Sequence, residues 1–289
     1  MQMAAKCGAH KLATPQGSAW QDQVRLILTK DGNAVAQVLN AGEMTSSLVA
    51  HLIKSSGCRL CCRISTGKAT GVIKIFGDED LDDQYAFERE RDVLIEMKDT
   101  GLVPRLKAYS DPNQWLLMED VGNADAIHTF TPVEFARKLG VWIAEFEAVA
   151  PCQQASGNWL GYFRKLGLEG PLRAIDGAEE TLAQTPLCGL VLSRNDPALH
   201  NHLQRADGRL LGCDFEKSTL RPRGWDYVNT WQALVERFPD NVDDVLPAFY
   251  DGFDHAHRGG LIMAELNAVA RIFFLAQFWV EQNRFGEAA

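Results

Sequence analysis

The sequence predicts an α+β fold with two lobes, a strand-rich lobe in residues 1–121 and a mostly helical lobe in residues 122–289. Short apolar runs bounded by turn residues dominate the first part, whereas apolar residues at helical spacing dominate the second. Gly122 and Asn123 separate the two parts and form a natural hinge. The chain has 289 residues, enough for two lobes, and its 46% apolar and 23% charged residues are typical of a globular protein.

Two strands and one helix organise the predicted first lobe. The run 71–76 is short and apolar with one lysine, Lys74, in its middle, which is typical of a strand. An acidic run then leads into a helix predicted over residues 84–98, whose apolar positions recur at helical spacing: Phe87, Val93, Leu94 and Met97. Pro104 prevents this helix from continuing, and a second strand is predicted over residues 115–121.

The second lobe begins with a clear helix-start signal. Thr131, Pro132 and Glu134 supply a capping hydroxyl, a first-turn proline and a capping-box glutamate, so a helix is predicted from there to about Val149. Three later helices are predicted over residues 227–238, 242–253 and 263–284. The most apolar stretch, residues 261–280, contains polar interruptions and is therefore predicted to be a buried helix rather than a membrane span.

Charge and cysteine content restrict the class of protein. The net charge is −9 and no basic stripe is present, which disfavours nucleic-acid binding and suits a cationic substrate. The seven cysteines have irregular spacing, so a disulfide framework is not expected; the group Cys58, Cys61 and Cys62 lacks a second pair at zinc-site spacing and is interpreted as part of a strand. Residues 1–20 lack a signal-peptide pattern. We therefore expect a cytoplasmic protein without a membrane or nucleic-acid partner.

Residues 191–216 carry the clearest chemical pattern. An apolar run leads into Asp196, Asn201 follows five residues later, and a hairpin around Asp207 and Gly208 delivers Asp214. Phosphoryl-transfer enzymes need one carboxylate that accepts a hydroxyl proton, here Asp196, and oxygen ligands for magnesium, here Asn201 and Asp214. The alternative is a surface turn followed by an ordinary hairpin, with Asn201 capping its own backbone.

A nucleotide needs further groups, and the first lobe offers candidates. Lys74 lies in an apolar strand, where it faces either solvent or an anion, and a lysine–glutamate pair is the expected arrangement for binding nucleotide phosphates. Glu90 is preferred to Glu88 as its partner, because it lies on the apolar side of the predicted helix. Arg63 is a rival for the role of Lys74. The backbone from Glu119 to Val121, at the hinge, is the candidate for holding an adenine base.

Other patterns carry less weight. The segments 40–47 and 55–58 precede Lys74 but lack the repeated glycines of a phosphate-covering loop, and residues 67–70 are interpreted as a hairpin turn rather than a P-loop. The His200–His202 and His255–His257 pairs lack an evident third metal ligand. The aspartates between residues 240 and 254 suit a solvated helix face or a pocket for an amine.

With these residues assigned, the stretch 34–231 resembles the aminoglycoside phosphotransferase and choline-kinase-like family of small-molecule kinases. The matching motifs are the Lys74 strand, the Glu90 helix, Val103-Pro104-Arg105-Leu106, Arg194-Asn195-Asp196 with Asn201, Asp214-Phe215-Glu216 and Gly224-Trp225-Asp226. The resemblance implies a protein-kinase-like fold, binding of ATP or GTP with Mg²⁺, and transfer to a hydroxyl of a small molecule. Arg194 stands where the family has histidine, and Pro197 directly after the candidate base is unusual.

Two other functions remain open from the sequence. The first is a catalytically degenerate, kinase-like nucleotide-binding or regulatory protein, which the departures at Arg194 and Pro197 motivate. The second is a kinase acting on proteins, which the missing Ala-Pro-Glu segment after Asp214 disfavours. The acceptor is left open among amino sugars, choline-like amines, sugars and amino alcohols, and the oligomeric state is also left open.

Overall fold

The computed structural model describes residues 24, 30, 35, 49–56, 59–65, 69–77, 85–122, 126–257 and 260–286. They divide into two compact units, one with residues up to Ile95 and Pro104–Asp120, the other with Glu96–Val103 and the residues from Val121 onward. This division differs from the predicted lobes in the segment Glu96–Val103. That segment packs with the helical unit because the Leu102 carbonyl accepts hydrogen bonds from the Trp142 indole and the Gly212 backbone, both at 3.0 Å.

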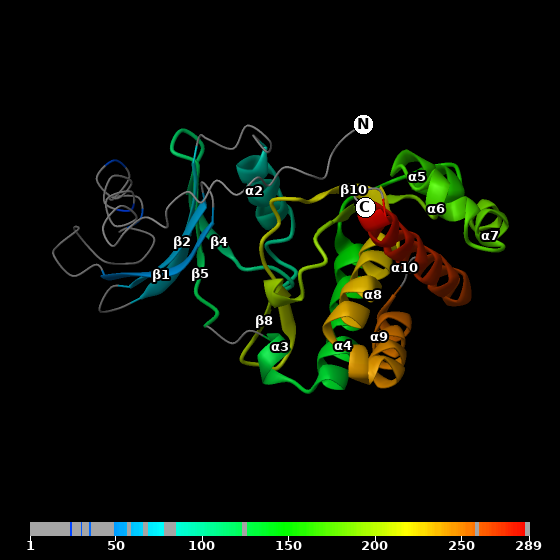
Figure 1. Cartoon of the computed structure of the whole chain (residues 1–289). Coiled ribbons are helices and arrows are strands. Elements are labelled where there is room, and N and C mark those ends of the chain that lie inside the picture. Colours follow the sequence, from blue (N-terminus) through cyan, green and yellow to red (C-terminus); the bar gives the residue numbers. More distant parts are fainter. Residues whose placement is uncertain are drawn as a thin grey trace. The chain divides into compact units, whose positions relative to one another are not determined.

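The first unit is built on a five-stranded antiparallel sheet in the order β1-β2-β3-β5-β4 (Figure 1). Its strands are β1 (Val49–Ser56), β2 (Arg59–Ser65), β3 (Thr70–Phe76), β4 (Leu106–Ser110) and β5 (Trp115–Glu119). β3 therefore pairs on both sides, and β2 and β3 form the hairpin expected there. Residues 40–48, 57–58 and 66–68 lie outside the described residues, and with them the whole candidate phosphate-covering segment 40–47 and the second half of the segment 55–58.

The two faces of this sheet differ in chemistry. Ile73 and Ile75 of β3 lie in an apolar cluster with residues of β2 and β5, namely Leu60, Cys62, Ile64, Trp115 and Leu117. Lys74 alternates with them and pairs in register with Cys61 and Leu116, so it lies on the opposite face. Helix α2 (Ala86–Glu96) buries Phe87 and its neighbours. It ends two residues earlier than predicted, where the Thr100 hydroxyl closes a turn by donating to the Met97 carbonyl.

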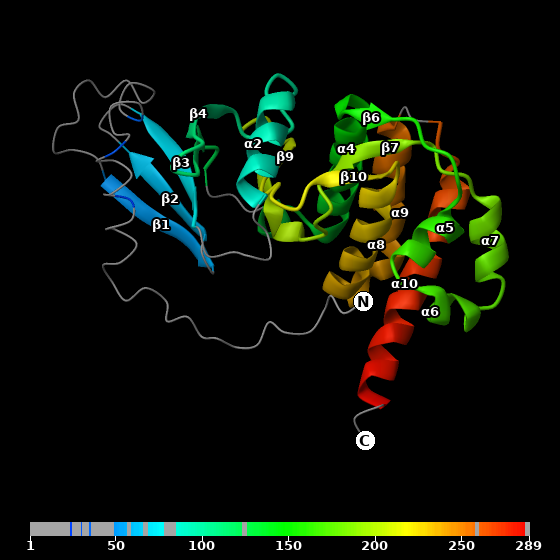
Figure 2. The ribbon, with the colours of Figure 1, turned by 90° about the horizontal axis from the view of Figure 1, so that it is seen from above.

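The second unit is mostly helical, as Figure 2 shows. Its helices are α3 (Ala126–Thr129), α4 (Pro132–Val149), α5 (Trp159–Lys165), α6 (Glu169–Arg173), α7 (Ala178–Gln184), α8 (Trp225–Arg237), α9 (Val242–Ala256) and α10 (Met263–Gly286), with 3₁₀ turns at Leu199–Asn201 and Pro239–Asn241. Its strands are β6 (Cys152–Gln153), β7 (Leu190–Ser193), β8 (His202–Gln204), β9 (Leu210–Gly212) and β10 (Thr219–Pro222). The sheet order β10-β7-β6 leaves β8 and β9 as a separate hairpin.

Helix α4 forms the centre of this unit. Its start is the predicted capping box: the Glu134 N–H donates to the Thr131 hydroxyl at 3.3 Å, and the Thr131 N–H donates to the Glu134 carboxylate at 3.1 Å. α4 crosses α9 at two glycines. A Cβ atom on Gly140 would lie 2.3 Å from the Phe249 carbonyl oxygen, and one on Gly252 would lie 2.1 Å from the Arg137 carbonyl oxygen. The backbones of the two helices are therefore in direct contact.

The hairpin of β8 and β9 differs from the two-residue turn that its Asp-Gly pair suggests. The Arg205 N–H donates to the Arg209 carbonyl and the Gly208 N–H donates to the Arg205 carbonyl, both at 2.9 Å, so three residues form the loop. Gly208 has a φ of 79°, the left-handed conformation that closes three-residue hairpin loops.

Helix α10 is only partly the buried helix that the sequence predicts. The stretch Met263–Asn283 is long and apolar enough to cross a membrane by length and composition, and 39% of its most apolar window is buried in the protein. Leu266 and Val269 lie in the core, whereas Phe278 and Trp279 near the end are exposed. One such helix is weak evidence for a membrane span, because the core helices of soluble proteins share its composition.

Candidate active site

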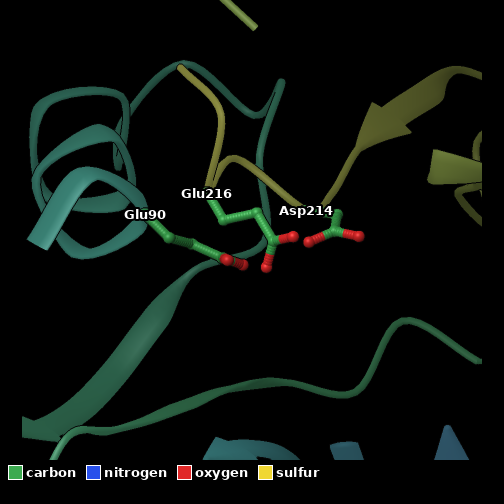
Figure 3. Close-up of side chains that lie close together, drawn as sticks. All are labelled: Glu90, Asp214 and Glu216. Carbon is green, nitrogen blue, oxygen red and sulfur yellow. The ribbon is translucent and has the colours of Figure 1, made fainter. Parts of the chain in front are cut away.

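Lys74 and Glu90 form a buried ion pair in the first unit. The Lys74 ammonium donates to the Glu90 carboxylate at 2.6 Å, and the residues are 8% and 1% exposed. The alternative of a solvent-facing lysine on an edge strand is therefore wrong, because β3 is paired on both sides. Figure 3 shows the Glu90 side chain extending from α2. Each charge is stable at this depth because the other compensates it.

Arg63, the rival of Lys74, has another partner. Its guanidinium donates to both carboxylate oxygens of Asp120, at 2.7 and 3.0 Å. Asp120 directly follows β5, and the division between the two units falls between Asp120 and Val121. At the predicted hinge, the Glu119 N–H already donates to the Arg105 carbonyl at 2.9 Å, and Val121 is half-buried. Asp120 was not anticipated from the sequence, although an acid next to the hinge is a suitable bidentate partner for a strand arginine.

In the second unit, Asp226 fastens the loop that follows β7. Its carboxylate accepts hydrogen bonds from the Ser193 hydroxyl at 2.7 Å, the Arg194 N–H at 2.9 Å and the Asn195 N–H at 3.1 Å. Asp226 is buried at the start of α8, so three short bonds compensate the removal of its carboxylate from water. From the sequence, Asp226 was expected only as part of the Gly224-Trp225-Asp226 motif, without a role of its own.

Asn195 connects the same loop to three other segments. Its side-chain amide donates to the Lys217 carbonyl at 3.3 Å, and its side-chain oxygen accepts from the Arg221 guanidinium and the Trp225 indole, both at 3.1 Å. Its φ of 56° lies in the left-handed region, which asparagine tolerates better than most side chains. The backbone directly before Asp196 is therefore fixed by both its dihedral angles and its side chain.

Asp196, the candidate base, lies on this loop with its carboxylate oriented by neighbours. One oxygen accepts from the Ala198 N–H at 2.9 Å, and the other is 3.5 Å from the Asn201 amide nitrogen and 3.4 Å from the Lys217 ammonium. The structure thus brings Asp196 and Asn201 together. The turn bond comes from Ala198, so the missing N–H of Pro197 leaves this hydrogen bond intact.

Asn201 is tied in turn to the segment that carries Asp214. The Cys213 N–H donates to the Asn201 carbonyl at 2.9 Å, and Asp214 follows with a left-handed φ of 66°. Phe215 is fully buried and stacks on Phe146, with ring centroids 5.8 Å apart. The residues on either side of Phe215 therefore carry the polar chemistry of this loop.

Asp214 and Glu216 point toward each other from this loop, as Figure 3 shows. Each offers a carboxylate oxygen, and these oxygens lie within 4.8 Å of one another. Together with the side-chain oxygen of Asn201, they are the hard oxygen donors that Mg²⁺ prefers, so the residues fit a magnesium ion that also binds phosphate oxygens. Glu216 was missed as a candidate ligand, although its position two residues after Asp214 was the available signal.

Arg194 belongs to the loop that carries Asp196, and its side chain is buried. It is 2% exposed, its guanidinium donates to the Ala198 carbonyl at 3.3 and 3.4 Å, and it lies over the Trp142 ring at 5.9 Å. Burial lowers the pKa of Arg194, and the nearby carboxylates of Asp226, Asp196 and Asp214 oppose that shift.

His202 is a core residue rather than half of a metal-binding pair. It is fully buried, its Nδ1 lies 3.3 Å from the Leu199 carbonyl, and its ring packs edge-on against Trp142. Burial, followed by the charge of Arg194, holds the pKa of His202 well below its usual range. His257 is 3.9 Å from Asp254, and the aspartates of residues 240–254 are all exposed, which fits a solvated helix face.

Glu147 supports the site from α4 and was not anticipated from the sequence. Its two carboxylate oxygens each lie 3.1 Å from the Gly224 N–H, directly before α8, and its carbonyl accepts from the Arg223 guanidinium at 2.9 Å. Burial, followed by the charge of Asp226, raises the pKa of Glu147 to about 8. The available signal in the sequence was the position of Glu147 on the apolar side of the helix predicted from Thr131 to about Val149.

Comparison with known proteins finds similarity at the level of structure. No protein-family model matches the chain, and no curated protein matches it. An ethanolamine kinase from Plasmodium vivax superposes with a TM-score of 0.60 at 15% identity, covering 91% of this chain and 81% of that chain. A choline kinase from Streptococcus pneumoniae gives 0.55 at 13% identity, covering 89% and 91%.

A third similar structure is that of an enzyme named for a different class of substrate. An aminoglycoside phosphotransferase from Alicyclobacillus acidocaldarius superposes with a TM-score of 0.54 at 13% identity, covering 84% of this chain and 82% of that chain. The TM-scores show a common fold, and identities this low leave the activity to the site itself. The chain therefore has the protein-kinase-like α+β fold of the choline and ethanolamine kinases and the aminoglycoside phosphotransferases.

Proposed function

We propose that the protein is a Mg²⁺-dependent phosphotransferase that moves the γ-phosphoryl group of ATP or GTP to a hydroxyl of a small molecule. The observation that carries the proposal is the linked set in the second unit. Asp196 and Asn201 share one loop, the Cys213 N–H ties that loop to Asp214 and Glu216, and Asp226 fastens its start. A set of two loops cross-linked in this way supplies a base beside oxygen ligands for a metal.

In the proposed reaction, Asp196 acts on the acceptor. The acceptor oxygen attacks the γ-phosphorus, the bond from that phosphorus to the bridging oxygen breaks, and the nucleoside diphosphate leaves. The hydroxyl proton passes to the Asp196 carboxylate, which the Ala198 N–H holds at 2.9 Å. Asn201 and Asp214, with Glu216 beside them, would hold magnesium, whose charge offsets that of the phosphates.

The first unit supplies the remaining roles in this proposal. Lys74, held by Glu90 at 2.6 Å, binds the α- and β-phosphates. The backbone of Glu119 and Val121 holds the nucleobase of ATP or GTP. The Glu119 N–H is not one of the groups used, because it donates to the Arg105 carbonyl. We place the protein in the cytoplasm, in keeping with its irregularly spaced cysteines.

The acceptor belongs, in this proposal, to the small hydroxyl compounds that carry an amine. The similar structures are named for ethanolamine, choline and aminoglycosides as substrates, and the net charge of −9 favours a cationic acceptor over a neutral sugar. Amino alcohols, choline-like amines and amino sugars are therefore the first compounds to test, with neutral sugars as the comparison set.

The test is phosphoryl transfer from ATP or GTP with Mg²⁺ to a panel of these acceptors, followed by ³¹P NMR and mass spectrometry of the product. Wild-type protein should phosphorylate at least one acceptor, and Asp196→Ala should abolish transfer while nucleotide binding persists. Unchanged turnover in Asp196→Ala would contradict the proposed mechanism.

A second candidate, a nucleotide-binding protein without transferase activity, rests on one specific observation. Arg194 places a buried positive charge two residues before the candidate base, where the resembling family has histidine. Magnesium-dependent nucleotide binding without transfer to any compound of the panel would favour this candidate.

A further inference from the structure

Arg194 is a permanent charge inside the loop that holds the candidate base. Its side chain is 2% exposed, and arginine does not deprotonate in proteins, so the charge is both fixed and shielded from water. The Ala198 carbonyl that accepts from this guanidinium at 3.3 Å also accepts from the Asn201 N–H at 3.2 Å, and the carboxylates of Asp226, Asp196 and Asp214 act on the charge. Of these three, Asp196 is the candidate base and Asp214 is a candidate metal ligand.

The contacts of Arg194 do not by themselves require a charge. Both of its hydrogen bonds end on the same Ala198 carbonyl, and at 3.3 and 3.4 Å they are long for a charged donor. A neutral donor could supply one of them. The Trp142 ring, 5.9 Å away, would pack against any flat side chain of similar size.

The electrostatic effect of the charge is harder to replace. A positive charge in a water-excluded interior acts strongly on other charges nearby, and it repels a divalent cation bound at Asp214. Burial disfavours the charged form of histidine, so a histidine in this position would lose the charge that arginine keeps. Lys217, whose ammonium lies 3.4 Å from the Asp196 carboxylate, is 55% exposed and therefore screened by solvent.

We propose that Arg194 lowers the affinity of the Asn201 and Asp214 site for divalent metal ions, acting as an internal counter-charge. This inference rests on the proposed function, because it concerns the metal site of that function. It makes Arg194 a positioning and tuning residue, one that acts through neighbouring acids without contacting the reacting atoms.

The experiment measures metal binding rather than turnover. Mn²⁺ binding to the full-length protein is followed by electron paramagnetic resonance, with and without a non-hydrolysable ATP analogue. Arg194→Gln and Arg194→His remove the charge, Arg194→Lys keeps it, and Arg173→Gln is the matched control on an exposed surface of α6. Each variant is first checked by circular dichroism and cooperative thermal unfolding.

The neutral variants should bind Mn²⁺ with a Kd lower by about 3- to 10-fold, an order-of-magnitude figure for one partly screened charge. Arg194→Lys and Arg173→Gln should stay within about twofold of the wild type. Folded neutral variants with unchanged or weaker metal binding would overturn the proposal and leave Arg194 as loop support only. If both neutral variants fail to fold while Arg194→Lys folds, the charge serves the fold and the proposal is also overturned.

The two proposals fail in different ways. Wild-type protein that binds no Mn²⁺, with or without the analogue, contradicts both. Protein that binds Mn²⁺ but phosphorylates no acceptor contradicts the phosphotransferase alone, while the comparison of Arg194 variants still decides the role of the charge.

Discussion

The carboxylate of Asp226 accepts a hydrogen bond from the backbone N–H of Arg194, 2.9 Å away and 32 residues earlier in the chain. The same carboxylate also binds the Ser193 hydroxyl and the Asn195 N–H, so the start of α8 sets the path of the loop that carries Asp196. A side chain that only accepts hydrogen bonds is needed here, because all three partners are donors.

Asp226→Asn should therefore impair both folding and turnover. The amide would direct donor hydrogens at one or more of the N–H groups, leaving buried donors without an acceptor, and we expect a loss of about 2–3 kcal/mol in the free energy of unfolding. Urea unfolding and transfer assays measure the two effects. Asp243→Asn, at an exposed position of α9, is the control and should change neither; equal effects of the two variants would contradict the role of Asp226.

Substitutions of Lys74 and Glu90 should have different effects on nucleotide binding and on stability. Glu90→Gln keeps the shape but removes the charge that orients Lys74, so we expect roughly a tenfold weaker Kd for ATP. Lys74→Met leaves Glu90 as an uncompensated buried carboxylate and should destabilise the protein by about 3 kcal/mol. Calorimetric titration and denaturant unfolding measure these quantities. Lys98→Met, on the exposed surface, is the control, and ATP affinity that is unaltered in Glu90→Gln speaks against the assigned role.

Lys217 should affect turnover more than stability. Its ammonium is 3.4 Å from the Asp196 carboxylate but the side chain is 55% exposed, so the pair contributes little to folding. Next to the reacting groups, the same charge can stabilise the phosphoryl group during transfer, and Lys217→Ala should lower kcat by about tenfold or more. Steady-state kinetics beside Lys165→Ala, an exposed lysine of α5, measures this. A kcat equal to that of the control would remove Lys217 from the reaction.

Glu147 predicts a pH dependence of stability. Burial and the charge of Asp226 raise its pKa in the folded protein to about 8, above the ordinary value of 4.5. Between these two values the folded state holds a proton that the unfolded state has lost, so stability is highest below about pH 4.5 and falls as pH rises toward 8. The expected loss from this group is a few kcal/mol.

Unfolding in urea at a series of pH values from 5 to 8 measures this slope. Glu147→Gln stays neutral throughout and can still accept from the Gly224 N–H, so the variant should gain stability relative to the wild type as pH rises from 5 to 8. A difference that is constant over this range would show that Glu147 ionises in the folded protein as it does in water.

The crossing of α4 and α9 should tolerate no side chain. A Cβ atom on Gly252 would lie 2.1 Å from the Arg137 carbonyl oxygen, so Gly252→Ala must push the helices apart, and we expect a loss of roughly 3 kcal/mol. Gly170→Ala on α6, where a Cβ atom would meet nothing within 4 Å, is the matched control and should be neutral or slightly stabilising. Thermal unfolding of both variants makes the comparison; similar melting temperatures would contradict the close contact.

Local signals in the sequence were sufficient for most elements of the fold. The capping box of Thr131 and Glu134, the β2–β3 hairpin and the strand around Lys74 each depend on residues close together in the chain, and the described structure has all three. The partner of Lys74 could also be anticipated, because the start of the helix after its strand offers Glu88 and Glu90, and helical spacing selects Glu90.

The supporting contacts of the site could not be anticipated in the same way. Glu147 meets Gly224 across 77 residues, and Asn195 meets Trp225 across 30, through packing that no local pattern encodes. The sequence near Arg63 did not indicate which acid would pair with its charge, because its partner Asp120 lies 57 residues away. Such contacts follow from how helices and strands assemble, not from the propensity of any single segment.

The glycine crossing of α4 and α9 has a consequence for how the second unit loses activity on heating. Side chains of α4 reach the neighbours of Asp196: Trp142 lies against Arg194, Phe146 stacks on Phe215, and Glu147 binds Gly224. Separation of the two helices would release all these supports at once. Thermal inactivation and the melting of α4 should therefore form one cooperative event, with slow amide hydrogen exchange in α4 lost at the same temperature as turnover.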